Sequence, residues 1–365
     1  MRRLTRAAAA GIAVLSVSLL AIPVDISGVP TGAATYALGS ASPPASRPAT
    51  GDLQSRVRTL VAWDNVGAAG SNDLAVPCPQ GTVAMGGGVD VSSVLKMTIF
   101  STGPTVNGSR LNATSNGTHG APDGWFGGVY NGDTIFRPFK VGAICVPLTG
   151  VTTVVTSITV DPEAWWFARA NCPAGKMVVG GGVDVEDDLS MIVTSSGPTI
   201  GGIRLINKPD GSYGAPDGWW GAVRNNAVSQ KTFKVGVVCQ PLGGITTVIS
   251  SNTATAQSWG TQAASCPTGS IAVGGGIDVE NVNSVLATAT APRFELPQAT
   301  LMQRAPGVQP APIGWQTSVF NNDPTVSKTF KVGAICARWP MAFFEGNDAP
   351  APDEDSEMEA EWTGR

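Results

Sequence analysis

The chain has 365 residues, of which 14% are charged, and a formal net charge of −4. This length is too great for one ordinary core and predicts two or three domains. The acidic excess lies after Glu345 and the leader is basic, so the body between them is close to neutral. Such a body lacks the positive surface that nucleic-acid binding requires, and we expect no nucleic-acid partner.

The first residues predict export. Three arginines within the first six residues precede an apolar run over 7–22 that is too short for a comfortable membrane span. We interpret residues 1–41 as a signal peptide with its cleavage region and residues 42–56 as a linker. The adjacent arginines leave twin-arginine export open as an alternative. We therefore expect a secreted, extracellular protein without a membrane span in its mature form.

One phrase occurs three times at a spacing of 94 residues. It reads CPQGTVAMGGGVDV from Cys78, CPAGKMVVGGGVDV from Cys172 and CPTGSIAVGGGIDV from Cys266. A second phrase, FKVGAIC or FKVGVVC, closes each copy. A fixed period outranks any local motif, so we expect three β modules. Their predicted ranges are 57–150, 151–244 and 245–341, followed by an acidic, disordered tail over 342–365.

The six cysteines predict a disulfide in each module. Fifteen pairings are possible in principle, but the repetition favours one bridge within each copy. The predicted pairs are Cys78–Cys145, Cys172–Cys239 and Cys266–Cys336. Each bridge should stabilise its module by roughly 4 kcal/mol on the chain-entropy estimate. A metal site would need closely spaced Cys/His clusters, and the sequence has none.

Within each module, alternating apolar residues predict an all-β fold. In the first copy the candidate strands are RTLVAW, DLAVPC, TVAMGGGVDV, MTIFSTG, RLNATSN, GWFGGVYN and FKVGAIC. Seven short strands fit one sandwich-like module. The alternative is that the three modules close into a single pseudo-threefold, β-prism-like body. The triple glycine weakens a strand, so we expect a bulge or the close approach of a backbone or aromatic ring there.

An aspartate follows each triple glycine, at Asp90, Asp184 and Asp278. As ligands these residues would bind Ca²⁺ or sugar hydroxyls, together with the acidic run Glu186, Asp187 and Asp188. A structural role would pair each with the lysine of FKVG across neighbouring strands. Those lysines are Lys140, Lys234 and Lys331. We favour the structural role and expect no cofactor, with Ca²⁺ kept as an alternative.

Aromatic and amide side chains also repeat. Trp125, Trp219 and Trp315 would either stack on a sugar ring or anchor a small core, and we favour the core. Six residues later come Asn131, Asn225 and Asn321, which would bind ligand or close the next turn. Trp165, Trp166 and Trp220 are less regular and are better candidates for an exposed aromatic platform.

A catalytic mechanism has little support. The only histidine, His119, has no counterpart in the other modules, and the cysteines are assigned to bridges. A polysaccharide hydrolase would use paired carboxylates, Asp90 with Asp123 or Asp184 with Asp217. The third module has Ile313 where the others have that second aspartate.

Two strings resemble a known family. SWGTQAASCPTGSIAVGGGIDVEN and AWWFARANCPAGKMVVGGGVDVEDD are similar to the Trp-Gly…Cys-Pro-x-Gly…Glu phrase of vitelline membrane outer layer protein I. The resemblance covers about a quarter of each module. It implies a secreted, disulfide-bonded β-prism linked to extracellular coats and carbohydrate. The module as a whole is similar to tandem CPxG…GGG…GW…N…C repeats in exported bacterial proteins, and no site residues are carried over from either likeness.

The sequence thus favours a non-catalytic extracellular binding or coat protein. Its partner would be an extracellular glycan or a cell-wall polymer, contacted three times so that weak contacts add. The alternatives are a secreted polysaccharide hydrolase and a purely structural surface protein. Oligomeric state is left open.

Overall fold

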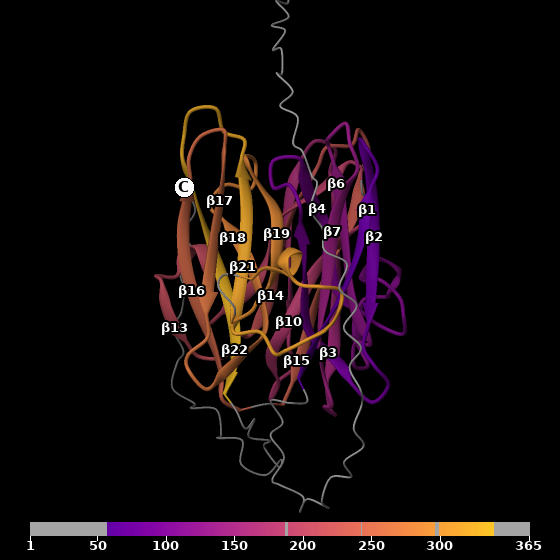
Figure 1. Cartoon of the computed structure of the whole chain (residues 1–365), viewed down its shortest axis with the longest axis vertical. Coiled ribbons are helices and arrows are strands. Elements are labelled where there is room, and N and C mark those ends of the chain that lie inside the picture. Colours follow the sequence, from indigo (N-terminus) through magenta and orange to yellow (C-terminus); the bar gives the residue numbers. More distant parts are fainter. Residues whose placement is uncertain (1–56, 187–188, 242, 296–298, 339–365) are drawn as a thin grey trace, which may run out of the picture. The chain divides into compact units, whose positions relative to one another are not determined.

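A computed structural model describes residues 57–186, 189–241, 243–295 and 299–338. The expected signal peptide, linker and acidic tail lie outside the described residues, as do Asp187 and Asp188. The described chain is almost entirely antiparallel β structure, which confirms the predicted fold class (Figure 1). Within it, no helix is long and apolar enough to cross a membrane.

The three modules contain equivalent elements. Module 1 comprises β1 (Arg58–Val66), β2 (Gly70–Pro77), β3 (Val83–Val91), β4 (Met97–Thr105), η2 (Leu111–Ala113), β5 (Gly117–His119), β6 (Gly124–Asn131) and β7 (Arg137–Val146). Module 2 comprises β8 (Thr152–Val160), β9 (Trp165–Asn171), β10 (Met177–Val185), β11 (Met191–Ile200), β12 (Ile203–Arg204), η3 (Leu205–Asn207), β13 (Gly211–Tyr213), β14 (Gly218–Asn225) and β15 (Lys231–Gln240). Module 3 comprises β16 (Ile245–Ala254), β17 (Ser258–Ser265), β18 (Ser270–Val279), β19 (Val285–Arg293), η4 (Leu301–Gln303), β20 (Gly307–Gln309), β21 (Gly314–Asn321) and β22 (Lys328–Arg338).

Each module divides its strands between two sheets, and each sheet combines two modules. In module 1, β1, β3 and β7 lie in one sheet with β17, β19 and β21 of module 3. Its β2, β4 and β6 lie in another sheet with β8, β10 and β15 of module 2. The third sheet joins modules 2 and 3 in the same way. The modules are therefore sandwiches that close into a ring, which the sequence analysis gave as the alternative to separate modules.

One sequence-based strand assignment is wrong. RLNATSN contains the 3₁₀ helix η2 instead of a strand, and the next three residues form β5. β5 pairs with β8 of the next module, and β13 and β20 pair with β16 and β1 in the same way. Local residue propensities cannot predict the short helix or these strand pairings, because the contacts that hold the helix and the short strand come from another module.

The triple glycines allow these sheets to form. A bulge precedes the first glycine of each run, between Val178 and Gly180 in module 2. A Cβ on Gly180 would lie 2.1 Å from the carbonyl oxygen of Met85, and one on Gly182 would lie 2.0 Å from that of Thr102. Both carbonyls belong to module 1. Modules 1 and 3 repeat these contacts, so the predicted bulge and close backbone approach are both confirmed.

The middle glycine accommodates a tryptophan ring. A Cβ on Gly181 would lie 2.4 Å from the indole of Trp219. That indole is 1% exposed and donates its N–H to Ser196 Oγ at 3.1 Å. The equivalent tryptophans, Trp125 and Trp315, are also buried and donate to threonines. The preferred core interpretation of these three residues is supported.

The disulfides connect the two layers of each sandwich. The bonded pairs are Cys78–Cys145, Cys172–Cys239 and Cys266–Cys336, as predicted. In module 1, Cys78 directly follows β2 and Cys145 lies in β7, which belong to different sheets. Each bridge therefore ties together the half-sheets that a module contributes to its two neighbours.

We predict that Gly181→Ala destabilises the fold by about 3 kcal/mol, because the added methyl group overlaps a rigid indole and a backbone oxygen. Gly214→Ala is the matched control, since a Cβ there meets nothing within 4 Å, and it should change stability by less than about 0.5 kcal/mol. Chemical denaturation of both variants measures the difference. Equal stabilities would contradict the packing role of the triple glycine.

Candidate binding surface

The repeated aspartates lie at the junctions between modules. Asp184 is 1% exposed, and its carboxylate accepts hydrogen bonds from Ser101 Oγ at 2.7 Å and from the backbone N–H of Asn112 at 2.8 Å. Arg110 donates to the same carboxylate at 2.5 Å. All three donors belong to module 1. Asp278 makes the equivalent contacts with Ser195, Arg204 and the N–H of Ile206 in module 2.

The lysines of FKVG hold the other end of the same short helix. Asp184 and Lys234 are directly opposite in register, as predicted. Lys234 Nζ, however, donates to the carbonyl oxygens of Asn112 and Thr114, at 2.9 and 2.5 Å. The carboxylate thus caps the N–H end of η2 and the ammonium caps its carbonyl end. The predicted cross-strand ion pair is replaced by this clasp around a helix of the neighbouring module.

A leucine completes each clasp. Leu111 of η2 is 1% exposed, and its side chain lies where a Cβ on Gly236 of FKVG would stand, 2.7 Å from the leucine methyl groups. Leu205 and Leu301 have the same relation to Gly333 and Gly142. The glycine of FKVG is therefore a socket for an apolar side chain of the neighbouring module.

The junction that closes the ring differs from the other two. Asp90 of module 1 accepts from the N–H of Met302 at 2.9 Å, but Ala289 and Thr300 of module 3 stand where the other junctions have serine and arginine. Burial raises the pKa of Asp90 above its ordinary value, against the lowering effect of its hydrogen bonds. Burial also lowers the pKa of Lys140, which Asp90 opposes.

The repeated asparagines close turns, as favoured from the sequence. Asn131 donates to the carbonyl oxygens of Gly67 and Ile135 and accepts from the N–H of Asp133, at 3.0, 2.8 and 3.0 Å. Asn225 and Asn321 do the same in their modules. Each therefore ties the turn after the first strand of its module to the turn before the last.

All nine residues predicted as ligand-binding are buried and have protein partners. They are Asp90, Asp184, Asp278, Trp125, Trp219, Trp315, Asn131, Asn225 and Asn321. Because these side chains are buried, we seek a binding surface among exposed residues, and the assignment of the nine as ligand-binding stays a prediction. The structure brings together no group of three or more His, Cys, Asp or Glu side chains suited to a metal among the described residues.

The carboxylate pairs of the hydrolase alternative are separated along the strands. Pro122, next to Asp123, accepts a hydrogen bond from the N–H of Ala84, six residues before Asp90 on β3. Pro216 and Val178 give the same spacing between Asp217 and Asp184. Six residues of strand span about 20 Å, whereas glycosidase carboxylates lie roughly 5–10 Å apart. Neither pair is arranged for glycosidic cleavage.

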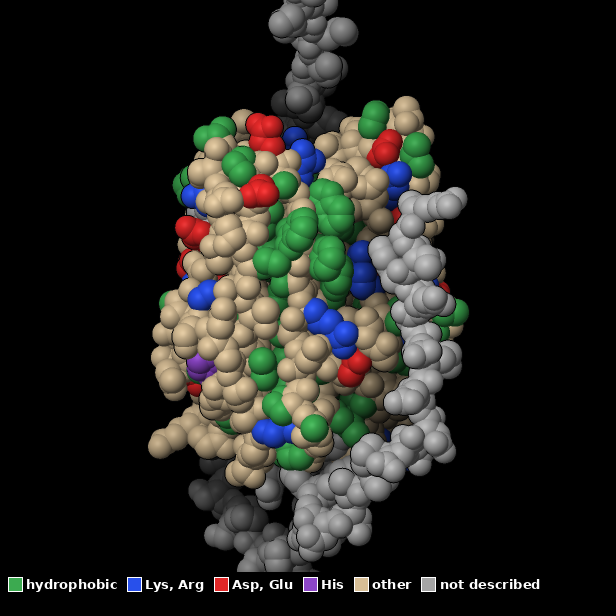
Figure 2. All heavy atoms as spheres, turned by 180° about the vertical axis from the view of Figure 1, so that it is seen from behind, with side chains coloured by type: hydrophobic (Ala, Val, Ile, Leu, Met, Phe, Trp, Pro, Cys, Tyr) green, Lys and Arg blue, Asp and Glu red, His purple; other side chains and the backbone are tan. Residues whose placement is uncertain are grey.

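An exposed aromatic face occupies module 2. It consists of Trp165, Trp166 and Phe167 on β9, which are 40%, 48% and 41% exposed, and Trp220 on the neighbouring strand β14. Phe167 stacks on Trp220 with ring centroids 4.4 Å apart, and Trp166 lies 5.9 Å from Phe167 with nearly parallel planes. Because β9 is an edge strand, one side of this face is open. Hydrophobic side chains gather in the upper half of the surface shown in Figure 2.

Arg204 links this face to a module junction. Its guanidinium lies 4.6 Å from the centre of the Trp220 ring and also binds Asp278. A cation held over an aromatic ring in this way restricts both side chains. Arg204 thus covers one face of the Trp220 ring while Asp278, across the junction between modules 2 and 3, holds the guanidinium in place.

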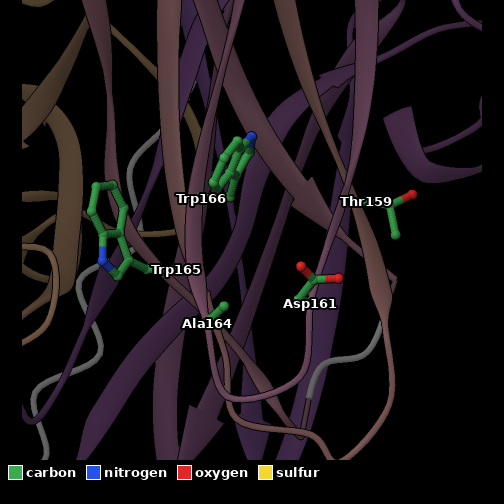
Figure 3. Close-up of a pocket in the computed structure, with 5 residues that line it drawn as sticks. All are labelled: Thr159, Asp161, Ala164, Trp165 and Trp166. Carbon is green, nitrogen blue, oxygen red and sulfur yellow. The ribbon is translucent and has the colours of Figure 1, made fainter.

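A hollow of about 460 Å³ adjoins the aromatic face where β8 turns into β9. Its lining residues are Thr159, Asp161, Ala164, Trp165 and Trp166 (Figure 3). The two indoles lie on one side of the close-up, and the Asp161 carboxylate and Thr159 hydroxyl lie on the other. Gln230 donates to the Asp161 carboxylate at 2.7 Å, which restricts its position. Aromatic faces beside a few polar groups are the usual composition of a small-ligand site.

The face is specific to module 2. By register, Trp166 and Phe167 correspond to Asn72 and Asp73 in module 1, and to Gly260 and Thr261 in module 3. In the sequence, Trp165, Trp166 and Trp220 are indicated by this departure from the repeat. Phe167, Thr159 and Asp161 could not be predicted, because nothing in the sequence shows that the turn after β8 faces the start of β9.

Comparisons with known proteins identify no family for this chain. No protein family and no curated protein matches the chain, so the resemblance to vitelline membrane outer layer protein I finds no support. Among solved structures, the chain is similar to the crystal structure of the STIV MCP, with 9% identity over 50% of this chain and 96% of that one. It is also similar to a structure described as the triple jelly roll fold and turret assembly in an archaeal virus, with 9% identity over 75% and 91%. Both TM-scores are 0.17, a weak resemblance that does not establish a shared fold.

We predict that the junctions respond unequally to loss of charge. At pH 7, Asp184→Asn should destabilise the fold by about 2 kcal/mol, because it removes the buried carboxylate that binds Arg110, Ser101 and the N–H of Asn112. Asp90→Asn should cost less than about 1 kcal/mol, since no arginine depends on Asp90. Urea unfolding of the two variants tests this, and a larger loss for Asp90→Asn would contradict it.

The raised pKa of Asp90 predicts a pH dependence of stability. A carboxyl whose folded pKa exceeds its unfolded pKa stabilises the fold while protonated, and this contribution is lost as pH rises from the unfolded pKa, 3.8, through the folded one. The difference in unfolding free energy between the native chain and Asp90→Asn should therefore shift against the native chain as pH rises from 4 to 7. A difference independent of pH would contradict a folded pKa of Asp90 that burial raises above its unfolded value.

Proposed function

We propose that the chain is a secreted, non-catalytic glycan-binding or coat protein of the extracellular surface, with its glycan site at the aromatic face of module 2. The supporting observation is the arrangement of Trp165 and Trp166 beside the Asp161 carboxylate in an open hollow. Pyranose rings have apolar faces that pack on indoles and hydroxyl rims that bond to carboxylates and hydroxyls.

The framework suits a rigid extracellular scaffold. Three disulfides and three interlocked sheets are compatible with an oxidising compartment. The proposal corrects the expectation that the same surface is presented three times, because the aromatic face occurs in one module. Avidity would then require several copies of the chain on one polymer.

A glycan array followed by titration of the best ligand tests the proposal. Trp166→Ala should weaken binding about tenfold or more, because it removes an indole from the centre of the contact. Trp259→Ala is the matched control: Trp259 is 51% exposed on β17 and is the register counterpart of Trp165, but it does not line the hollow of Figure 3.

Three outcomes would count against the proposal. They are no binding to any glycan, equal loss of binding in the two variants, or release of reducing sugars by the native chain. Thermal unfolding of both variants shows whether a loss of binding reflects a loss of fold.

A further inference from the structure

The exposed large hydrophobic side chains of the described chain gather at one end of the strands. All three modules have that end in common, because β10 pairs with β4, β18 with β11 and β3 with β19 in antiparallel registers. The loops at this end connect β3 to β4 and β6 to β7 in module 1, and the equivalent strands in modules 2 and 3. Both ends of the described chain, at Val57 and Arg338, lie at the opposite end, since Arg58 pairs with Cys145 and Arg338 with Ser270.

Eleven of the thirteen exposed large hydrophobics lie at this end, which we call the apolar end. Six are in its loops and five in the adjoining strand residues: Leu95, Ile135, Phe136, Leu189, Val228 and Val326, then Trp63, Trp165, Trp166, Phe167 and Trp259. Phe136 is 73% exposed and Val228 is 89% exposed. Only Ile203 and Val308 lie elsewhere. The loop before β22 is at the top of Figure 1, and the same end is at the top of Figure 2.

The two kinds of side chain occupy different levels. At this end the exposed aliphatic groups and Phe136 lie in the loops, whereas the exposed strand residues are aromatic: Trp63, Trp165, Trp166, Phe167 and Trp259. Tryptophan prefers the interface between apolar and aqueous phases, whereas aliphatic side chains prefer the apolar phase beyond it. All three modules contribute exposed hydrophobic side chains to this end.

Charges at this end are of both signs, and two ion pairs form among them. The loops and strand ends carry seven acidic and five basic described residues. Arg137 binds Asp133 at 2.5 Å and Lys328 binds Asp323 at 3.4 Å, and the pKa values of both carboxyls are lowered, chiefly by the guanidinium of Arg137 and the N–H of Thr325. The slight acidic excess disfavours anionic lipids and also the acidic segment after Glu345 of this chain. Interspersed charges of both signs complement zwitterionic headgroups.

We propose that the apolar end docks on the surface of a zwitterionic lipid bilayer, inserting its loop side chains while the tryptophans lie at headgroup level. This contact is separate from the proposed glycan site, although Trp165 and Trp166 border both. Exposed apolar side chains that gather in one region of a surface mark an interaction site.

Flotation with phosphatidylcholine vesicles that contain no glycan tests the proposal. We expect the native chain to partition onto the vesicles with little dependence on salt. The triple variant Phe136→Ser, Val228→Ser, Val326→Ser, with one change in each module, should reduce the partition coefficient at least tenfold. The matched control, Ile203→Ser with Val308→Ser, changes the two exposed hydrophobics outside the apolar end and should alter it less than twofold.

Four results would overturn the proposal: no partition of the native chain, equal loss in both variants, binding only to phosphatidylglycerol, or a salt-sensitive interaction. Sedimentation velocity distinguishes docking on lipid from self-association of the chain. A dimer of the native chain that the triple variant abolishes, without vesicle binding, would assign the apolar end to a second copy. Because the vesicles carry no sugar and Trp166 is unchanged, failure here leaves the glycan proposal standing, and failure of the glycan test leaves this one.

Discussion

The contact between backbones at the triple glycines is the constraint on which the rest of this structure depends. Strands from successive modules approach until a carbonyl of one stands where a side chain of the next would begin, as Met85 does against Gly180. Only glycine allows this distance. With it, half-sheets of neighbouring modules join into continuous sheets. Any side chain there would separate the modules and expose the edges of six half-sheets.

Polar clasps give these junctions their direction. Each module binds a 3₁₀ helix of its neighbour through an aspartate at the N–H end and a lysine at the carbonyl end. These buried charges are tolerated because every one is hydrogen-bonded or paired. The junction at Asp90, which joins the first module to the last, lacks the serine and the arginine of the other two junctions. The backbone arrangement thus repeats in all three modules, whereas the charged contacts differ between the three junctions.

The interior repeats while the surface does not. Residues that recur in all three modules, among them the GW tryptophans and the turn asparagines, are buried and maintain the framework. Residues that break the repeat, above all Trp166 and Phe167, are exposed. A repeated scaffold therefore leaves individual surface positions free to differ, and function is best sought at those differences. The aromatic face of module 2 follows this rule.

The sequence by itself determined the β class, the three modules and the disulfide pairing, because period, alternation and cysteine spacing are local properties of the chain. It also indicated Trp165, Trp166 and Trp220 through their departure from the repeat. Only the tertiary structure decided that modules share sheets, that RLNATSN forms a helix, and that Asp184 binds Arg110 as well as facing Lys234. The same holds for the gathering of exposed hydrophobics at one end. These features depend on contacts between residues far apart in the sequence, such as Arg110 and Asp184, which are 74 positions apart, and no local preference of the chain encodes such contacts.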